Sequence, residues 1–248
     1  MTRDDDKLPA EVGLLRKLAR LPLLGLITLM AGCGGFVYHR VQPGDTLYSI
    51  SWRYGLDYRE VAGWNHIQPP YTIYNGQLLR VMPPTGREGH TASAPAASHP
   101  APVIHAPAAA AQSGTSSTGS ATAPIKWLWP IQGHVIQTFS RTDLGRKGID
   151  IGGKPGEAIR AAAAGQVVYA GSGLLSYGKL IILKHNDNYL SAYAYNRDLL
   201  VKEGDAVVAG QHIADMGSKT HGDAMLHFEI RYDGRPINPL QYLPRKRR

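Results

Sequence analysis

The pattern of apolar and polar positions predicts two folded modules separated by a segment without periodicity. In the first module, Leu47 and Ile50 recur at helical spacing, and Gly55 marks the end of that helix. Asp45, at its start, is expected to cap the free amides. A second helix is expected to begin near Asp57. With a strand on either side, the order β-α-α-β is predicted for residues 38–82.

The second module, residues 125–248, shows short apolar or alternating runs bounded by turn residues, which is typical of strands. Nothing in it favours a helix longer than one turn. An antiparallel all-β domain is therefore predicted, with its clearest strands at 165–170, 179–184, 189–194 and 226–232.

Between the modules, residues 83–124 are dominated by five residue types. Of these 42 residues, 34 are Ala, Pro, Ser, Thr or Gly. Such a segment cannot bury enough apolar surface to offset its conformational entropy. We expect a disordered linker, which makes the whole chain a multi-domain protein.

The first 32 residues have the layout of a secretory signal. Basic side chains precede an uncharged stretch, residues 21–30, and small residues follow it. The stretch is too short to cross a bilayer as a helix, which takes about 20 apolar residues. A buried core helix is the alternative, which Pro22 and Gly25 disfavour.

The single cysteine, Cys33, follows Leu29-Met-Ala-Gly32, and this run resembles a bacterial lipobox. The resemblance implies lipidation of Cys33 and an acyl anchor. Gly34 after it, rather than Asp, implies an outer-membrane lipoprotein that faces the periplasm.

The expected location in the envelope limits the partners that the net positive charge can indicate. The chain carries +8, and residues 1–32 hold five basic and four acidic side chains, so cleavage leaves +7. Nucleic acid is not expected as a partner in the envelope. Anionic lipid or the wall polymer is the natural counterpart of this charge.

The first module resembles a LysM domain. The residues that carry the resemblance are Tyr38-His-Arg-Val-Gln-Pro-Gly-Asp-Thr-Leu-Tyr-Ser-Ile50, Trp64-Asn-His-Ile67 and Tyr74-Asn-Gly-Gln-Leu-Leu-Arg-Val81. The family binds N-acetylglucosamine-containing glycan, so peptidoglycan is implied as a partner. The implied glycan-binding residues are Gly44, Asp45, Thr46, Asn65 and Ile67; the alternative is that they cap a helix or pack.

The second module resembles the LytM, or lysostaphin-type, zinc metallopeptidase domain. The resemblance rests on Lys147-Gly-Ile-Asp-Ile151, Tyr193-Ala-Tyr195 and Met225-Leu-His227. Active members of that family carry H-x-G-x-D, Y-x-H and H-x-H. Here Asp150 and His227 remain, whereas Arg146, Tyr195 and Met225 stand where histidines are expected.

Those replacements argue against catalysis. A catalytic zinc needs three protein ligands and one open position, and two ligands fall short. Arginine has no lone pair to donate, and tyrosine is a poor general base at neutral pH. We expect no enzyme activity, no metal and no cofactor. His185, His212 and His221 do not lie at the spacing of the missing ligand, although His221 remains a candidate.

The zinc position then needs another cation beside Asp150. We expect the Arg146 guanidinium to fill it, because an unpaired buried carboxylate is costly. The alternative is that Arg146 points to solvent and Asp150 accepts from backbone amides.

Signal, lipobox, LysM module, linker and degenerate LytM module together resemble NlpD-type envelope lipoproteins. The resemblance implies a non-catalytic activator of periplasmic N-acetylmuramoyl-L-alanine amidases that act in septal wall splitting. The implied partner groove includes Arg146, Asp150, Tyr195, Met225 and His227. Two alternatives stay open, a zinc endopeptidase with an unrecognised ligand and a passive tether between outer membrane and wall.

Overall fold

The structure is a computed structural model that describes residues 37–84, 124–143, 145–219 and 222–245. The described residues from 37 onward belong to one compact unit. The expected signal, Cys33, His221 and linker residues 85–123 lie outside the described residues. Within the described ranges, no helix is both long and apolar enough to cross a bilayer.

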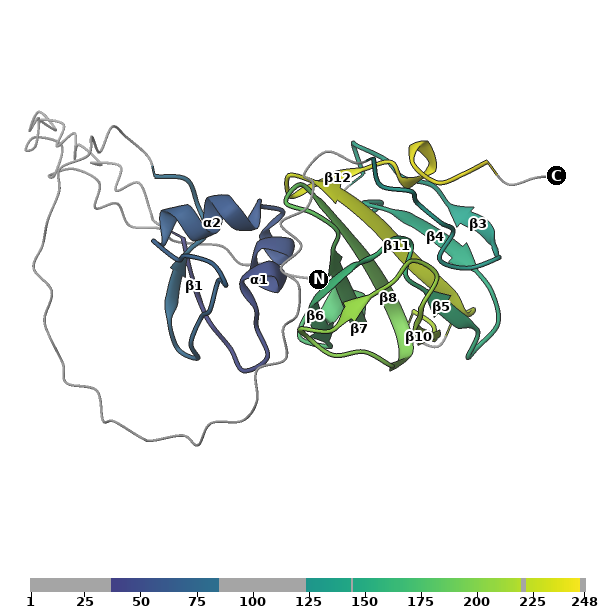
Figure 1. The fold of residues 1–248 in the computed structure, drawn as a ribbon, viewed down its shortest axis with the longest axis horizontal. Coiled ribbons are helices and arrows are strands. Elements are labelled where there is room, and N and C mark those ends of the chain that lie inside the picture. Colours follow the sequence, from purple (N-terminus) through teal and green to yellow (C-terminus); the bar gives the residue numbers. More distant parts are fainter. Residues whose placement is uncertain (1–36, 85–123, 144, 220–221, 246–248) are drawn as a thin grey trace, which may run out of the picture. The chain divides into compact units, whose positions relative to one another are not determined.

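The amino-terminal module has the predicted β-α-α-β order. Strand β1 (Tyr38–Arg40) pairs antiparallel with β2 (Leu78–Arg80), and helices α1 (Leu47–Tyr54) and α2 (Tyr58–Trp64) lie between them in the chain (Figure 1). Their inner faces share one small core of buried side chains, which consists of Val41, Leu47, Ile50, Val61, Ala62, Leu79 and Val81.

Both helices of this module have defined ends, one of which differs from the prediction. Thr46, not Asp45, caps α1: its hydroxyl accepts from the Ser49 amide, and the Ser49 hydroxyl accepts in return from the Thr46 amide. Asp45 instead accepts from the Gln42 amide. Gly55 ends α1 at φ 69°, a left-handed conformation that glycine adopts without strain.

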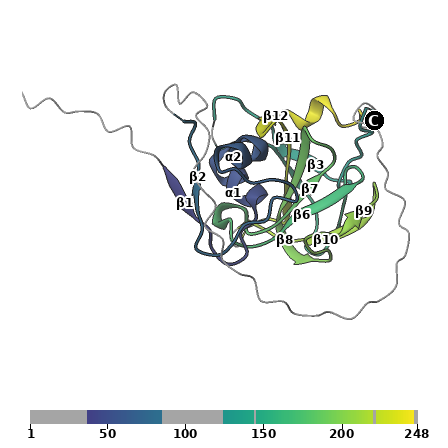
Figure 2. The same ribbon diagram turned by 60° about the vertical axis from the view of Figure 1, so that its left-hand side comes forward.

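The carboxy-terminal module is an antiparallel sheet, as predicted. Its main path runs β3-β4-β11-β8-β7-β6-β9, and over the described residues β10 also pairs with β5 and β8, and β12 pairs with β11. The long strands β8 and β11 run side by side (Figure 1, Figure 2). The strands are β3 His134–Gln137, β4 Ile149–Gly152, β5 Ala158–Arg160, β6 Gly165–Gly171, β7 Lys179–Lys184, β8 Tyr189–Leu199, β9 Ala206–Val207, β10 His212–Met216, β11 Met225–Tyr232 and β12 Arg235–Ile237. Two single-turn 3-10 helices, η1 (Leu175–Tyr177) and η2 (Pro239–Gln241), complete the elements.

Strands β7 and β8 are buried on both faces. Ile181, Leu183 and Tyr193 belong to the main core of this module. The residues that alternate with these along the two strands, among them Leu180 and Ile182, belong to a second cluster on the opposite face. A sheet face needs an apolar cover to leave water, so the second cluster must contain side chains from elsewhere.

The cover of this second face comes from the amino-terminal module. Trp52 of α1 and Tyr58 of α2 are 2% and 3% exposed and pack in the same cluster as Leu180 and Ile182. Polar contacts reinforce the packing: the Thr46 hydroxyl donates to the Val168 carbonyl at 3.1 Å. The two modules therefore share a core.

Candidate functional site

The centre of the candidate site is the polar face of strand β11. Because side chains alternate along a strand, His227, Glu229 and Arg231 project to one face, while Phe228 and Ile230 enter the main core on the other. All three polar side chains are buried, at 6%, 0% and 1% exposure. Buried charges require partners, and each of these has one.

His227 uses both ring nitrogens to bind carboxylates. Nδ1 lies 2.5 Å from Asp150 Oδ1 on the neighbouring strand β4, and Nε2 lies 3.1 Å from Glu229 Oε1. Burial by itself lowers the pKa of His227, but the hydrogen bonds to Asp150 and Glu229 outweigh it and raise the pKa to about 9. At neutral pH the ring is an imidazolium that donates from both nitrogens.

Glu229 lies between two cations. Its Oε1 also accepts from the Tyr177 hydroxyl at 2.8 Å, and its Oε2 accepts from Arg231 Nε at 3.0 Å. Burial by itself raises the pKa of Glu229, but the charge of Arg231 and the bond to His227 lower it to about 2. Asp150, His227, Glu229 and Arg231 thus form a row of alternating charges.

The far end of this row contacts the amino-terminal module. The Arg231 guanidinium carbon lies 3.5 Å from the centre of the Trp52 ring, and Nη1 donates to the Trp52 carbonyl at 3.0 Å. A guanidinium stacked on indole in a dry site gains about 2 kcal/mol. Helix α1 is therefore attached to the same row of charges that ends at Asp150.

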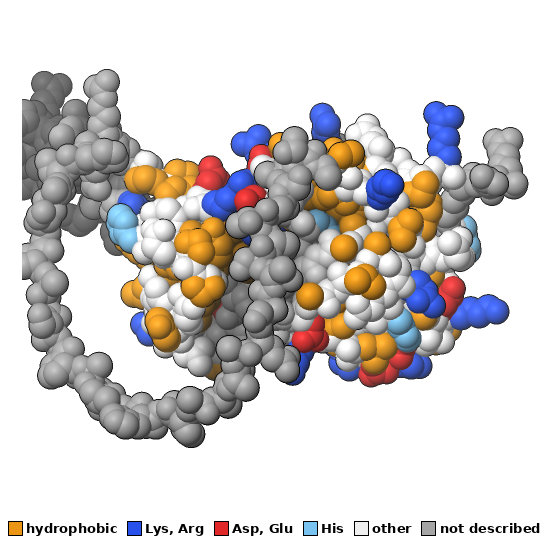
Figure 3. All heavy atoms as spheres, viewed as in Figure 1, with side chains coloured by type: hydrophobic (Ala, Val, Ile, Leu, Met, Phe, Trp, Pro, Cys, Tyr) orange, Lys and Arg blue, Asp and Glu red, His pale blue; other side chains and the backbone are white. Residues whose placement is uncertain are grey.

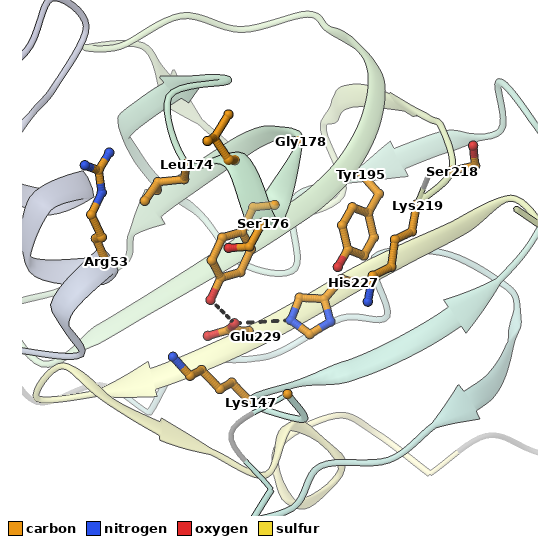
Figure 4. A pocket seen from close by; sticks show the side chains of 13 residues that line it. Arg53, Lys147, Leu174, Ser176, Gly178, Tyr195, Ser218, Lys219, His227 and Glu229 are labelled. Carbon is orange, nitrogen blue, oxygen red and sulfur yellow. Dashed lines mark hydrogen bonds and ion pairs between the residues drawn. The ribbon is translucent and has the colours of Figure 1, made fainter. Parts of the chain in front are cut away.

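A groove opens over the other end of the row. His227 and Glu229 form part of its lining, and Tyr195 of β8 and Tyr177 of η1 lie beside them. Figure 4 shows Lys147 and Lys219 on two sides of the His227–Glu229 pair, with Arg53 of α1 at a third. Lys219 Nζ lies 5.7 Å from the centre of the Tyr195 ring. The groove is thus polar at its floor and cationic around its edge.

Tyr195 is held in an unusual backbone conformation. Its φ is +64°, in the left-handed region that costs a residue with a Cβ about 1–2 kcal/mol. The Tyr195 carbonyl accepts from the Gly217 amide at 2.9 Å. A Cβ at Gly217 would lie 2.5 Å from that carbonyl oxygen, so only glycine fits there. Backbone strain of this kind persists where surrounding structure enforces it, often at functional positions.

The expected pairing of Arg146 with Asp150 is wrong. Arg146 Nε donates to Asp143 Oδ2 at 3.0 Å, and that pair is exposed, with side chains 41% and 50% accessible. Asp150 is paired with His227 instead. The physical reason is that the retained histidine, once protonated, already supplies the cation that the carboxylate needs.

Of the five residues expected in the partner groove, the structure brings three together. Tyr195 and His227 line the groove, and Asp150 lies beneath His227. Met225 opens strand β11 opposite Gly152, and it does not appear in the lining of the groove, nor does Arg146.

The arrangement does not fit a zinc ion at this position. Both nitrogens of His227 donate hydrogen bonds to carboxylates and offer no lone pair to a metal. Arg146 and Tyr195 offer no neutral nitrogen donor. Over the described parts of the chain, His, Cys, Asp and Glu nowhere gather in a group of three or more arranged to hold a metal ion.

His185 and His212, which the sequence offered as substitute ligands, have structural surroundings. His185 Nδ1 lies 2.8 Å from the Ala164 carbonyl oxygen and Nε2 lies 2.7 Å from Ser191 Oγ. Burial lowers the pKa of His185 to about 4, although the Ala164 bond opposes the shift. His212 pairs with Asp215 at an exposed site.

The expected glycan-binding residues lie in two loops of the amino-terminal module. Asp45 accepts from His39 Nε2 at 2.9 Å, and Thr46 caps α1. Asn65 follows α2 and binds both the amide and the carbonyl of Arg80. Ile67 packs against the module core, and Gly44, at φ 82°, lies in an exposed turn. Each therefore has a structural role, and the Thr46 hydroxyl also donates to the Val168 carbonyl of the other module.

The sequence alone does not indicate several residues of the site. Lys147 lies in the run Lys147-Gly-Ile-Asp-Ile151, and Glu229 and Arg231 lie in a predicted strand, but these positions alone predict no role for them. The alternation of His227, Glu229 and Arg231 with apolar residues was the signal that they share a face. Arg53 and Lys219 had no such signal, since their approach to the groove depends on tertiary packing.

Comparisons with known proteins match both modules. The LysM domain profile matches residues 39–81, and the Peptidase family M23 profile matches residues 145–239. A Pseudomonas aeruginosa protein named lipoprotein NlpD/LppB homolog is 44% identical over 227 residues, which cover 83% of this chain and 76% of that protein. The chain belongs to the NlpD/LppB lipoprotein family.

Two Escherichia coli proteins are also similar over most of the chain. Murein hydrolase activator NlpD is 40% identical, with 84% of this chain and 68% of that protein covered. The uncharacterized lipoprotein YgeR is 39% identical, with 92% and 94% covered. The sequence resemblance to NlpD-type lipoproteins with LysM and LytM-type modules is thereby confirmed.

Proposed function

We propose that this protein is a non-catalytic activator of a periplasmic N-acetylmuramoyl-L-alanine amidase. The observation that carries the proposal is the engagement of both His227 nitrogens by Asp150 and Glu229. The position where the M23 fold would use a metal holds a closed row of charges, while the groove above it stays accessible. The name murein hydrolase activator, borne by relatives at 40–41% identity, supports this role.

Activation needs no chemistry from this chain. An amidase that exchanges between a closed and an open state shifts toward the open state if the activator binds that state more tightly. A shift from mostly closed to mostly open requires a difference in binding free energy of about 5.5 kcal/mol. The groove, with Tyr195 and His227 in its lining, is the proposed contact for the amidase.

We further propose that the LysM module, residues 38–82, binds peptidoglycan through Gly44, Asp45, Thr46, Asn65 and Ile67. Lipidation at Cys33 would hold the chain at the outer membrane, facing the periplasm, because several acyl chains suffice for stable anchoring. The module of residues 125–248 would then act at the wall, where a septal amidase works.

Dye-labelled sacculi test this proposal. Dye release is followed with the soluble protein from Gly34 onward, with a periplasmic amidase, and with both together. We expect release above the amidase rate only when both are present. If the protein alone releases dye, and a chelator abolishes this release, a zinc endopeptidase is favoured instead. If the protein alone releases no dye and does not change the rate of the amidase, the passive tether is the remaining function.

A further inference from the structure

The lining of the groove contains more cationic side chains than the buried carboxylates beneath it need for neutralisation. Within the buried row, His227 pairs with Asp150, and Arg231 pairs with Glu229. Lys147, Lys219 and Arg53 are additional cations in the lining, and among the described residues no carboxylate pairs with either lysine. On the face drawn in Figure 3, Lys and Arg side chains are spread out, and several lie beside Asp or Glu.

One of these cations belongs to the amino-terminal module. Arg53 follows Trp52 on α1, and its Nη2 donates to the Gly173 carbonyl at 3.1 Å, just before the wall of the groove. Its guanidinium lies 3.6 Å from Asp45, which already accepts from His39, so Arg53 is only partly neutralised. The side chain is 34% exposed. Packing of Trp52 against Arg231 is what holds α1 at this edge.

The same wall offers an apolar contact. Leu174 and Leu175 both line the groove; Leu174 is 4% exposed, whereas Leu175 is 94% exposed. An isolated exposed leucine is ordinary on a protein surface. Here it borders a cavity edged by cations, and that combination selects an occupant with carboxylates next to an apolar side chain.

We infer that the groove binds a protein segment of the partner that carries acidic residues beside an apolar anchor, and that Arg53 makes the LysM module part of this binding site. The inference rests on the proposed activator function and deepens it. A wall stem peptide offers carboxylates but no large apolar side chain for Leu175, so the observations favour a protein segment. Binding then requires that the two modules be docked.

The test uses the full soluble chain and the amidase whose dye release it accelerates. The concentration of activator that gives half-maximal acceleration is measured for wild type, Arg53→Glu and Arg40→Glu. Arg40 is the matched control: it lies on β1 of the same module, donates to Gly76, and is absent from the groove lining. Circular dichroism and thermal melting confirm that each variant is folded.

We expect Arg53→Glu to raise the half-maximal concentration about 3- to 10-fold and Arg40→Glu to leave it unchanged. Added NaCl should weaken the wild type more steeply than Arg53→Glu, because one screened attraction has been removed. Leu175→Asn should weaken activation without changing the salt dependence. Equal behaviour of the two arginine variants overturns the inference while leaving the proposed function intact.

Competition by soluble wall stem peptides separates the two occupants. If they displace the amidase and Leu175→Asn has no effect, the occupant is a wall peptide and the inference fails. If wild type accelerates no amidase, the proposed function itself fails, and the inference that rests on it fails too. These outcomes differ in whether wild-type activation is present.

Discussion

The guanidinium of Arg231 is stacked on the indole of Trp52, with 3.5 Å between the guanidinium carbon and the ring centre. The two residues come from different modules and are 1% and 2% exposed respectively. Arg231 also holds Glu229 through Nε. One contact therefore attaches the LysM module to the M23 module and supplies a partner for a buried carboxylate.

Arg231→Ala should destabilise the protein by about 3–5 kcal/mol, because Glu229 is left buried with half of its positive partners. The free energy of unfolding is measured by urea titration followed through tryptophan fluorescence. Replacing both residues, as in Glu229→Gln with Arg231→Met, should recover part of the loss. A loss of less than about 1 kcal/mol for Arg231→Ala would mean that Arg231 contributes little to the stability of the row of charges.

Arg146→Ala should change the free energy of unfolding by no more than about 0.5–1 kcal/mol. Among the described residues its side chain pairs with Asp143 alone, three residues away at an exposed site, and such pairs contribute little. The same urea titration serves, with Arg231→Ala as the contrast. A loss comparable to that of Arg231→Ala would restore the pairing with Asp150 that the sequence suggested.

His185 should make stability fall in mild acid. Its folded-state pKa of about 4 lies below the ordinary 6.5, so the unfolded state binds more protons between these values. Stability from neutral His185 is present above pH 6.5 and declines as pH falls toward 4, by about 1–3 kcal/mol. His185→Gln should flatten this part of the stability–pH curve. His212→Gln, at an exposed site, is the control, and an equal flattening by both variants would contradict the assignment.

At position 195 glycine should be more stable than alanine. Both substitutions remove the ring, but only glycine accepts φ +64° without strain, which favours Tyr195→Gly over Tyr195→Ala by about 1 kcal/mol. In an ordinary strand alanine would be the better residue. Thermal melting measures the order, and the reverse order would mean that the backbone relaxes. Both variants should lose amidase activation equally if the ring is the contact.

Added zinc or chelator should leave the melting temperature unchanged. Binding of a metal to the folded state alone would raise it in proportion to occupancy, and His227 offers no free nitrogen for such binding. Differential scanning fluorimetry with ZnCl₂ and with EDTA measures this. If zinc raises the melting temperature, and His227→Ala abolishes this effect, zinc displaces the hydrogen bonds that His227 makes in the row of charges.

Local pattern was enough to predict the elements but not the way in which they share a core. Turn residues and helical spacing predicted the end of α1 at Gly55 and the strands β6, β7, β8 and β11. The run Leu180-Ile-Ile-Leu183 has no polar alternation, which is typical of a strand covered on both faces, so a cover for this face was foreseeable. That Trp52 provides it depends on the shapes of two surfaces and was not.

The candidate site, like the fold, was predictable from the sequence only where its features are local. Asp150, Tyr195 and His227 were found because their motif positions are local in sequence. The choice of partner for Asp150 was wrong, because Arg146 and His227 compete for it and only the tertiary arrangement decides between them. Arg53 enters the groove from another module, and no spacing in the sequence encodes that approach.

The contact between Trp52 and Arg231 joins residues separated by 179 positions. During synthesis the amino-terminal module emerges first, and Trp52 lacks its Arg231 partner until strand β11 has been made. Contacts of such long sequence separation form slowly, and an uncovered apolar face invites association with other chains in the meantime. The shared core therefore places a demand on biogenesis: the aromatic side of the first module gains its cover only after the second module has been made.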